Sequence, residues 1–279
     1  MILAICKLEE GLIKKYSDVL TYLPLSNEET DSSWQALIKT HCPKAIIFGL
    51  QTINQEKLSF WRWCQPDDTL QFVRKGTSLH RVDFASAEKY RIAVHNTAGV
   101  NAQFVAQFIV DTLIDQSDTV GILGVGAIGK KTASMLLAKH KKLILFNRTD
   151  HSLEGSQYRY TDLMYLFTNA PEIAICLPLT QETTGLVTEK MVNTIPQNSQ
   201  ISCISPPRVL SKEAIIALDK RSDLRVTFDH VASGLGFIHE SLGRTSLRDN
   251  FIFEEKAAAG HDCQYAMGEA AILRILRDQ

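Results

Sequence analysis

The chain has 279 residues, of which 45% are hydrophobic and 22% are charged, and its formal net charge at pH 7 is −1. This balance is typical of a globular protein of one or two domains and argues against a disordered chain. A near-neutral chain without a basic block is not expected to bind nucleic acid, and its longest apolar runs, such as 45–50, are too short to span a membrane. The first residues resemble a β-strand rather than a secretory signal.

Short apolar segments alternate with helical ones along the chain. Strands are expected at 1–6, 45–49, 70–73, 92–94, 119–123, 142–146, 173–177, 200–204, 225–228 and 250–253. Several are almost entirely apolar, which is typical of strands covered on both faces of a parallel sheet. Helices are expected at 101–114, 128–139, 211–218 and 261–276, with Ser211 as an N-cap. The pattern predicts an α/β fold with two Rossmann-like, doubly wound parallel sheets, in residues 1–98 and about 117–249.

The cysteines and histidines give no sign of a disulfide framework or a metal site. Six cysteines lie at positions 6, 42, 64, 176, 203 and 263, without a C-x-x-C pair, and the eight histidines are scattered. Cys6, Cys176 and Cys203 lie in apolar, strand-like runs, where a free thiol behaves as a small hydrophobic group. We therefore expect reduced thiols, a cytoplasmic protein and no metal.

A glycine-rich turn follows the expected strand at 119–123. Its residues fit G-x-G-x-x-G and lead into the expected helix at 128–139; they are Gly124, Val125, Gly126, Ala127, Ile128 and Gly129. In this context the pattern is typical of a dinucleotide site. The first glycine permits a tight turn, the second lets backbone N–H groups approach a pyrophosphate, and the third allows close helix–strand packing. The helix N-terminus favours the negative phosphates. The alternative is a glycine-rich turn without a ligand.

The end of the next strand indicates which dinucleotide binds. NAD sites usually place Asp or Glu there, about 20 residues beyond the turn. Here Asn147 occupies that position and is followed by Arg148 and Thr149. Because a carboxylate would repel a 2′-phosphate, whereas a guanidinium and a hydroxyl attract it, the sequence favours NADP(H), with NAD(H) possible. Alternatively, Arg148 is a solvated loop charge or stacks on adenine.

Four further segments carry a family resemblance. Residues 74–83 look like R-x-G-x-G-x-D-N-I-D, 94–101 like V-x-N-x-P-G-x-N, 105–107 like V-A-E, and 177–185 like L-P-L-T-x-E-T-x-G. In this order they resemble the D-isomer-specific 2-hydroxyacid dehydrogenase family, from about residue 44 to 260. The resemblance implies two Rossmann-like domains with a cleft between them, and hydride transfer between NAD(P)H and a small 2-oxo acid.

The resemblance also implies a division of labour between the domains. Residues 1–98 would form a flavodoxin-like substrate-binding domain, with the C-terminal helix of about 255–279 packing back on it, and residues 99–254 would bind NAD(P). In the first domain the substrate carboxylate would be bound by Arg74, Gly76, Thr77 and Ser78. Arg74 and Lys75 would add positive charge to the cleft, or would be surface charges at a strand end. In the second domain the cofactor would also contact Leu177, Pro178, Thr183 and Asp229.

The catalytic set that the family implies is altered. The family uses an Arg to bind the carboxylate, a His to supply a proton and a Glu to orient that His. A gap-free match places Pro206 at the Arg position; Arg208, two residues on, is the replacement after a short shift, or an Arg that points elsewhere. The Glu position falls on Gly234.

The proton donor is equally open. The His position falls on Lys256, and a lysine can donate a proton. His261, five residues on, is the second candidate, and it would otherwise begin the final helix. The third possibility is that the chain has no catalytic acid.

A deletion and three hypotheses complete the sequence-based interpretation. Only thirteen residues, 108–120, separate the segment at 105–107 from Gly121, so most of the arm that builds the family's dimer is missing, and we expect a monomer or a different dimer. The first hypothesis is an NADP(H)-dependent oxidoreductase acting on a small keto or imino carboxylate. The second is a dinucleotide-binding pseudoenzyme. The third, weaker one is a dehydratase or cyclase that uses bound NAD(P) internally.

Overall fold

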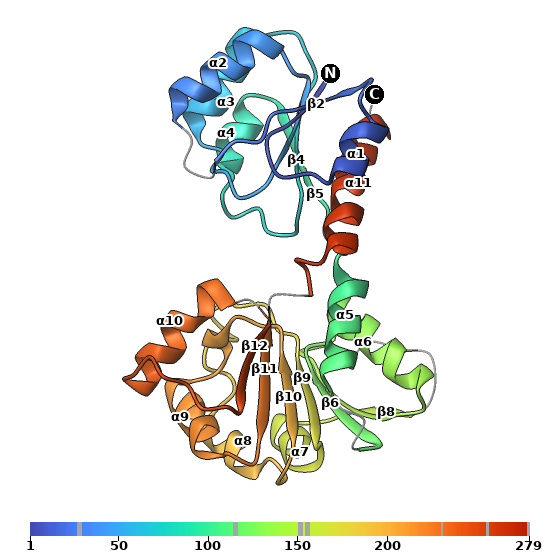
Figure 1. The fold of residues 1–279 in the computed structure, drawn as a ribbon, viewed down its shortest axis with the longest axis vertical. Helices are drawn as coiled ribbons and strands as arrows, with labels where there is room; N and C mark the ends of the chain where they lie inside the picture. The colour runs from blue at the N-terminus through green and yellow to red at the C-terminus, as the bar shows by residue number, and fades with distance from the viewer. Residues whose placement is uncertain are drawn as a thin grey trace. The chain divides into compact units, whose positions relative to one another are not determined.

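The computed structural model describes residues 1–26, 30–113, 117–149, 153, 157–229, 231–254 and 257–277. The chain divides into two compact units, here called unit 1 (Met1–Asn101 with Gly260–Gln279) and unit 2 (Ala102–Ala259). Unit 1 is built on a five-stranded parallel sheet and unit 2 on a seven-stranded one (Figure 1). The predicted α/β fold with two doubly wound parallel sheets is confirmed.

The sheet of unit 1 has the strand order β2-β1-β3-β4-β5. Its strands are β1 (Ile2–Ala4), β2 (Leu20–Tyr22), β3 (Ala45–Phe48), β4 (Leu70–Arg74) and β5 (Ile92–Asn96), and its helices are α1 (Glu10–Lys15), α2 (Asp31–His41), α3 (Gln55–Cys64), α4 (Phe84–Lys89) and α11 (His261–Arg277). All of the strand pairs are parallel. The strand order reverses its direction between β1 and β3, and ligands of open α/β sheets bind at such a point, beyond the carboxyl ends of the strands.

Alternate side chains of these strands pack on opposite faces. Leu3, Ile46 and Phe72 belong to the core shared with α2, α3 and α4, where the rings of Trp61 and Phe72 lie 4.7 Å apart. The neighbouring strand residues pack instead against α1 and α11, so the last helix of the chain covers one face of the sheet of unit 1 (Figure 1). The two helical layers bury both faces, as the apolar runs in the sequence require.

The sheet of unit 2 has the strand order β12-β11-β10-β9-β6-β7-β8, again all parallel. Its strands are β6 (Thr119–Leu123), β7 (Lys142–Phe146), β8 (Tyr158–Tyr160), β9 (Glu172–Ile175), β10 (Gln200–Cys203), β11 (Arg225–Asp229) and β12 (Phe251–Glu254). Its helices are α5 (Ala102–Thr112), α6 (Ala127–Ala138), α7 (Leu163–Asn169), α8 (Glu189–Thr194), α9 (Lys212–Lys220) and α10 (Val231–Leu242), with one 3-10 turn, η1 (Pro207–Val209). Helices α5 and α6 share one core with the sheet, and α7 to α10 share the other.

The sequence missed the two edge strands β2 and β8. Each has only three residues and mixes aromatic with polar side chains, so neither forms an apolar run. The second sheet also extends beyond the expected limit of 249, because β12 pairs with β11. Cys6, Cys176 and Cys203 are buried free thiols, as predicted. Among the described residues, no helix is long and apolar enough to cross a membrane.

Candidate functional site

The glycine-rich turn of unit 2 has the geometry that a dinucleotide site needs. Gly124 has φ +96°, and a Cβ added there would lie 2.8 Å from the carbonyl oxygen of Cys176. A Cβ on Gly129 would lie 2.0 Å from the carbonyl oxygen of Gly124, so helix α6 can approach the turn only with glycine at this position. A Cβ on Gly126 would have nothing within 4 Å. The turn is tightly packed at Gly124 and Gly129 and open at Gly126.

The start of α6 offers unused backbone donors on that open side. The helix begins at Ala127 and its N-cap, Gly126, has no side chain to accept a hydrogen bond. In the part of the chain that the structure describes, no group accepts from the N–H groups of residues 126–129. Free N–H groups and the positive end of a helix favour an anion. The cradle therefore fits a pyrophosphate.

Asn147, beyond β7, is tied into the turn. Its Oδ1 accepts from the N–H of Val125 at 2.9 Å, and its Nδ2 donates to the carbonyl oxygen of Thr149 at 2.6 Å. The exposed Arg148 has its Nη1 3.6 Å from Oε2 of Glu182, and these side chains are 86% and 75% exposed. An exposed pair of this kind contributes little. The Arg148 guanidinium is therefore available for another anion.

A second turn follows β9 and neighbours the glycine-rich turn, since Cys176 contacts Gly124. The hydroxyl of Thr183 donates to the carbonyl oxygen of Pro178 at 2.6 Å and accepts from the N–H of Thr180 at 2.8 Å, so it closes this turn internally. The N–H of Leu177 donates to Oγ of the buried Ser205 at 2.7 Å, and that hydroxyl donates to the carbonyl oxygen of Ile175. Sequence analysis missed Ser205, whose only signal is that it follows an apolar strand.

The segment 74–80 of unit 1, here called the 74–80 loop, begins with two buried cations. Arg74 is 8% exposed and Lys75 is 9% exposed, so neither is a surface charge. Gly76 has φ +136°, and its N–H donates to Oγ1 of Thr97 at 2.9 Å.

The tip of the 74–80 loop is exposed. Asn96 donates from Nδ2 to the carbonyl oxygen of Thr77 at 2.6 Å, and Oγ of Ser78 lies 2.5 Å from Nδ1 of His80. In the described residues no acceptor is paired with the N–H groups of Thr77 and Ser78. The loop therefore presents two backbone donors beside a buried guanidinium.

The two predicted catalytic residues that the structure describes belong to different units. Arg208 lies in η1 of unit 2, with its Cζ 4.8 Å from the centre of the Phe237 ring. His261 is the first residue of α11 in unit 1, its side chain is 77% exposed, and its Nδ1 lies 3.3 Å from Oδ1 of Asp262. Asp229, which is expected to contact the cofactor, is buried at the end of β11, where its Oδ1 accepts from the N–H of Ala257 at 3.4 Å. Lys256 lies outside the described residues.

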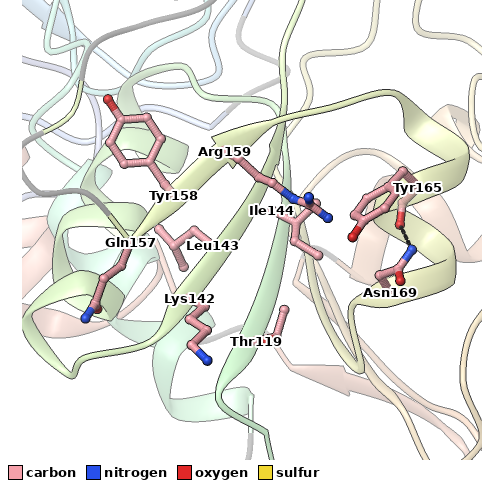
Figure 2. Close-up of a pocket in the computed structure, with 9 residues that line it drawn as sticks. All are labelled: Thr119, Lys142, Leu143, Ile144, Gln157, Tyr158, Arg159, Tyr165 and Asn169. Carbon is pink, nitrogen blue, oxygen red and sulfur yellow. Dashed lines mark hydrogen bonds between the residues drawn. The ribbon is translucent and has the colours of Figure 1, made fainter.

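An open cavity of about 540 Å³ lies elsewhere in unit 2. Its lining includes Thr119 and Lys142, the first residues of β6 and β7, together with Arg159 of β8 and Tyr165 of α7. Figure 2 shows Arg159 pointing toward Tyr165, and its Cζ lies 4.0 Å from the centre of that ring. The glycine-rich turn follows the opposite end of β6. The cavity is thus separated by the length of a strand, about 16 Å for five residues, from the dinucleotide cradle.

Comparison with known proteins finds a family match over part of the chain. Residues 100–232 match the family described as "D-isomer specific 2-hydroxyacid dehydrogenase, NAD binding domain". Over this segment, which is just under half of the chain, the sequence is a distant member of that family. The matched segment includes the glycine-rich turn, Asn147, the 177–185 turn and Arg208. The family is one of oxidoreductases.

Individual relatives are distant. An erythronate-4-phosphate dehydrogenase of Acinetobacter baumannii is 27% identical over 174 residues, covering 57% of this chain and 48% of the relative. The chain thus spans about half the length of the curated relatives it matches. D-lactate dehydrogenase of Escherichia coli has a TM-score of 0.77 at 15% identity, covering 99% of this chain and 96% of that one. The NAD+-bound D-lactate dehydrogenase of Lactobacillus jensenii has a TM-score of 0.78, also at 15% identity, with the same coverage. These structures share the fold.

Gly234 of α10 packs tightly against the 3-10 turn. This glycine, which Sequence analysis expects at the position of the family's Glu, lies against Pro207 of η1. A Cβ added to Gly234 would lie 2.4 Å from Cδ and Cγ of Pro207. The proline ring therefore fills the space from which a side chain at position 234 would start. The Pro206–Pro207 pair and Gly234 are here called the proline corner, where η1 meets α10.

Proposed function

We propose that the chain is an NADP(H)-preferring oxidoreductase that transfers hydride to or from a small 2-oxo, 2-hydroxy or imino acid. The observation that carries this proposal is the glycine-rich turn. Its N–H groups at 126–129 are unused among the described residues, and the space above Gly126 is open. In an NAD-binding family, this cradle is where a pyrophosphate would be held. When bound, the nicotinamide cofactor supplies or accepts the hydride.

The preference for NADP(H) rests on the end of β7. Asn147 replaces the acidic side chain that would repel a 2′-phosphate, and its amide is held by Val125 and Thr149. Among the described residues, Arg148 beside it is engaged in one exposed ion pair, with Glu182. A guanidinium binds a phosphate by two parallel hydrogen bonds, which favours NADP(H) over NAD(H). Leu177, Pro178 and Asp229 would border the nicotinamide side of the same site.

Unit 1 would bind the substrate. The N–H groups of Thr77 and Ser78, which have no acceptor among the described residues, suit a carboxylate, and Gly76 lets the chain turn so that both donors are exposed. Lys256 is the proposed proton donor to the substrate oxygen, with His261 as the second candidate. Arg208 is the less suitable carboxylate ligand, because its guanidinium stacks on Phe237.

A second candidate function is dinucleotide binding without turnover. The proline corner favours this function, because Pro207 leaves no room for a side chain at position 234. In the gap-free match to the family, Pro206 also stands at the position of the Arg that binds the carboxylate. Such a protein would bind NADPH through the same turn and reduce nothing.

The deciding experiment follows NADPH absorbance with a panel of 2-oxo acids, with and without ammonia or amines. Lys256→Ala is the test variant. Arg148→Ala is the comparison variant, because it keeps every proposed catalytic residue and weakens the binding of NADPH. Turnover that Lys256→Ala abolishes, with NADPH binding intact, supports the oxidoreductase and its acid. Unchanged turnover in Lys256→Ala refutes the role of Lys256 as the proton donor. Tight NADPH binding without turnover on any compound favours the binding protein.

The proposed oligomeric state follows from the short connection between α5 and β6, which spans only 113–118. Because the family's dimer arm has no room there, we expect a monomer or a dimer through another surface. Sedimentation at micromolar concentration distinguishes them.

A further inference from the structure

The cavity beside α7 exists because this helix leaves part of the sheet of unit 2 uncovered. A Cβ added to Gly121 of β6 would lie 2.9 Å from side-chain atoms of Leu166 and Ala170, so α7 packs closely over β6. Helix α7 has only seven residues, and β8, the strand before it, is the edge of the sheet. Part of the same face of β7 and β8 therefore stays open beside the helix and lines the cavity of about 540 Å³. A cavity of this volume can hold a small organic molecule.

Two cationic side chains stand on this open face. Ile144 of β7 pairs in parallel register with Arg159 of β8, and Lys142 lies two residues before Ile144. Because alternate residues of a strand share a face, all three side chains belong to the same face of the sheet. One strand and two residues separate the two cations, which corresponds to about 8 Å between their Cα atoms. Figure 2 shows them on the strands, across the cavity from Tyr165 and Asn169 of α7.

Neither cation has a countercharge among the described residues. No Asp or Glu lines the cavity, and Lys142 forms no ion pair within the described part of the chain. Arg159 has its Cζ 4.0 Å from the centre of the Tyr165 ring, which carries no charge. Asp118, just before β6, forms no described ion pair with either cation, and Asp162 caps α7 by accepting from the N–H of Tyr165 at 2.8 Å. Because like charges on one face repel each other, a dianion between them would be favourable.

The lining fits a phosphate ester of a small organic molecule. A guanidinium binds phosphate by two parallel hydrogen bonds, and an ammonium binds it as a point charge. A phosphate ester carries a charge of about −1.5 to −2 at pH 7, which two cations balance, whereas a carboxylate carries a single charge. Gln157 and Thr119 add hydrogen-bonding groups to the lining, and Ile144 adds an apolar surface.

We infer that this cavity binds a small phosphate ester, with its phosphate between Lys142 and Arg159 and its organic part over Ile144. The inference does not rest on the proposed function, because the cavity shares no lining residue with the glycine-rich turn or the 74–80 loop. The cavity lies at the opposite end of β6 from the glycine-rich turn, so a phosphate ester and a dinucleotide can bind at the same time.

The test measures the binding of phenyl phosphate to the full chain, by NMR titration of the backbone amides at constant ionic strength. We expect saturable binding, and weaker binding of benzoate, which has the same ring but a single charge. Lys142→Met and Arg159→Met should each weaken phenyl phosphate about tenfold or more, the value of a hydrogen bond to a charged group. Lys142→Arg, which keeps the charge, should bind nearly as tightly as the wild type. Both cations are exposed, so the Tm of these variants should stay close to that of the wild type.

Lys139→Met and Arg148→Met are the matched controls. Lys139 is an exposed cation close to β7 that does not line the cavity. Arg148 is the exposed cation beside the glycine-rich turn. Each control removes one positive charge and leaves the cavity unchanged, so the affinity for phenyl phosphate should stay at the wild-type value. Saturating NADPH should also leave this affinity unchanged.

The outcomes separate a built site from general attraction of anions. Saturable binding that requires Lys142 and Arg159 and persists in both controls upholds the inference. Absence of binding in the wild type, or an equal loss in Lys139→Met, overturns it. Loss in Arg148→Met or with NADPH would place the probe at the glycine-rich turn and overturns it as well, as does equal affinity for benzoate. Binding at the cavity in a protein that turns over no 2-oxo acid would uphold this inference while refuting the oxidoreductase.

Discussion

The glycine-rich turn and the proline corner lie in the same unit, but different physical features give each its geometry. The turn at 124–129 works through backbone N–H groups and empty space, and each glycine has a steric or electrostatic reason. In the proline corner, by contrast, side-chain packing decides the geometry, because the Pro207 ring fills the space beside Gly234. A site made of backbone N–H groups depends on empty space, whereas the corner depends on the space being filled.

The largest expected effect comes from closing the turn. Gly129→Ala places a methyl group 2.0 Å from the carbonyl oxygen of Gly124, so α6 must move away from the turn. We expect a loss of about 1–3 kcal/mol or more in the free energy of unfolding, and loss of NADPH binding. Urea denaturation and calorimetric titration measure the two effects. Gly126→Ala is the matched control. It should fold with the stability of the wild type and should only weaken the binding of NADPH. Equal stability of the two variants would contradict the steric role of Gly129.

The corner can be tested with two glycines of the same helix. Gly234→Ala should destabilise the protein by about 1–3 kcal/mol, because its Cβ meets Pro207. Gly236→Ala has nothing within 4 Å of its Cβ, so it should stabilise α10 by up to about 1 kcal/mol. Denaturation of both, and of Gly234→Ala combined with Pro207→Ala, measures the coupling. Gly234→Ala that is as stable as Gly236→Ala would show that the corner is not closed by Pro207.

The open side of the turn is tested by the cofactor preference. Arg148→Ala should weaken NADPH by roughly tenfold or more, the value of a charge-assisted hydrogen bond, and leave NADH almost unchanged. Glu182→Gln is the control, because it removes the ion pair with Arg148 and should leave NADPH binding equal or tighter. Fluorescence titration with both dinucleotides gives the ratio. Equal losses for NADPH and NADH would mean that Arg148 does not contact the 2′-phosphate.

The smallest expected effect is the change that the charge of Arg208 makes to the pKa of Glu240. The pKa of Glu240 lies below its ordinary value, first because of the hydrogen bond from Lys212 at 2.6 Å and, to a smaller extent, because of the charge of Arg208. Arg208→Ala should therefore raise this pKa slightly, and Lys212→Ala should raise it more. A carboxyl titration by NMR measures both. An unchanged value in Arg208→Ala would show that the guanidinium does not act on α10 and is free for a substrate.

Local patterns in the sequence determined much of this protein. Apolar runs specify buried parallel strands, Ser211 accepts from the N–H of Ala214 as an N-cap should, and the expected helix at 261–276 is α11. The strand–turn–helix spacing of the glycine motif also predicts its geometry. These features depend on neighbours within a few residues, so they can be derived without knowing the rest of the fold.

Tertiary structure alone decided the remainder. Edge strands β2 and β8 form because a sheet was available to pair with, and Ser205 joins two strand ends that are 28 residues apart in the chain. The sequence left Arg74 and Lys75 undecided between surface and interior. Packing buries both, and among the described residues Lys75 pairs with Glu9 whereas Arg74 lies over the Phe48 ring. Pro207 and Gly234 meet only when η1 and α10 are packed together. Burial, pairing and steric exclusion depend on residues distant in the chain, so no local pattern contains them.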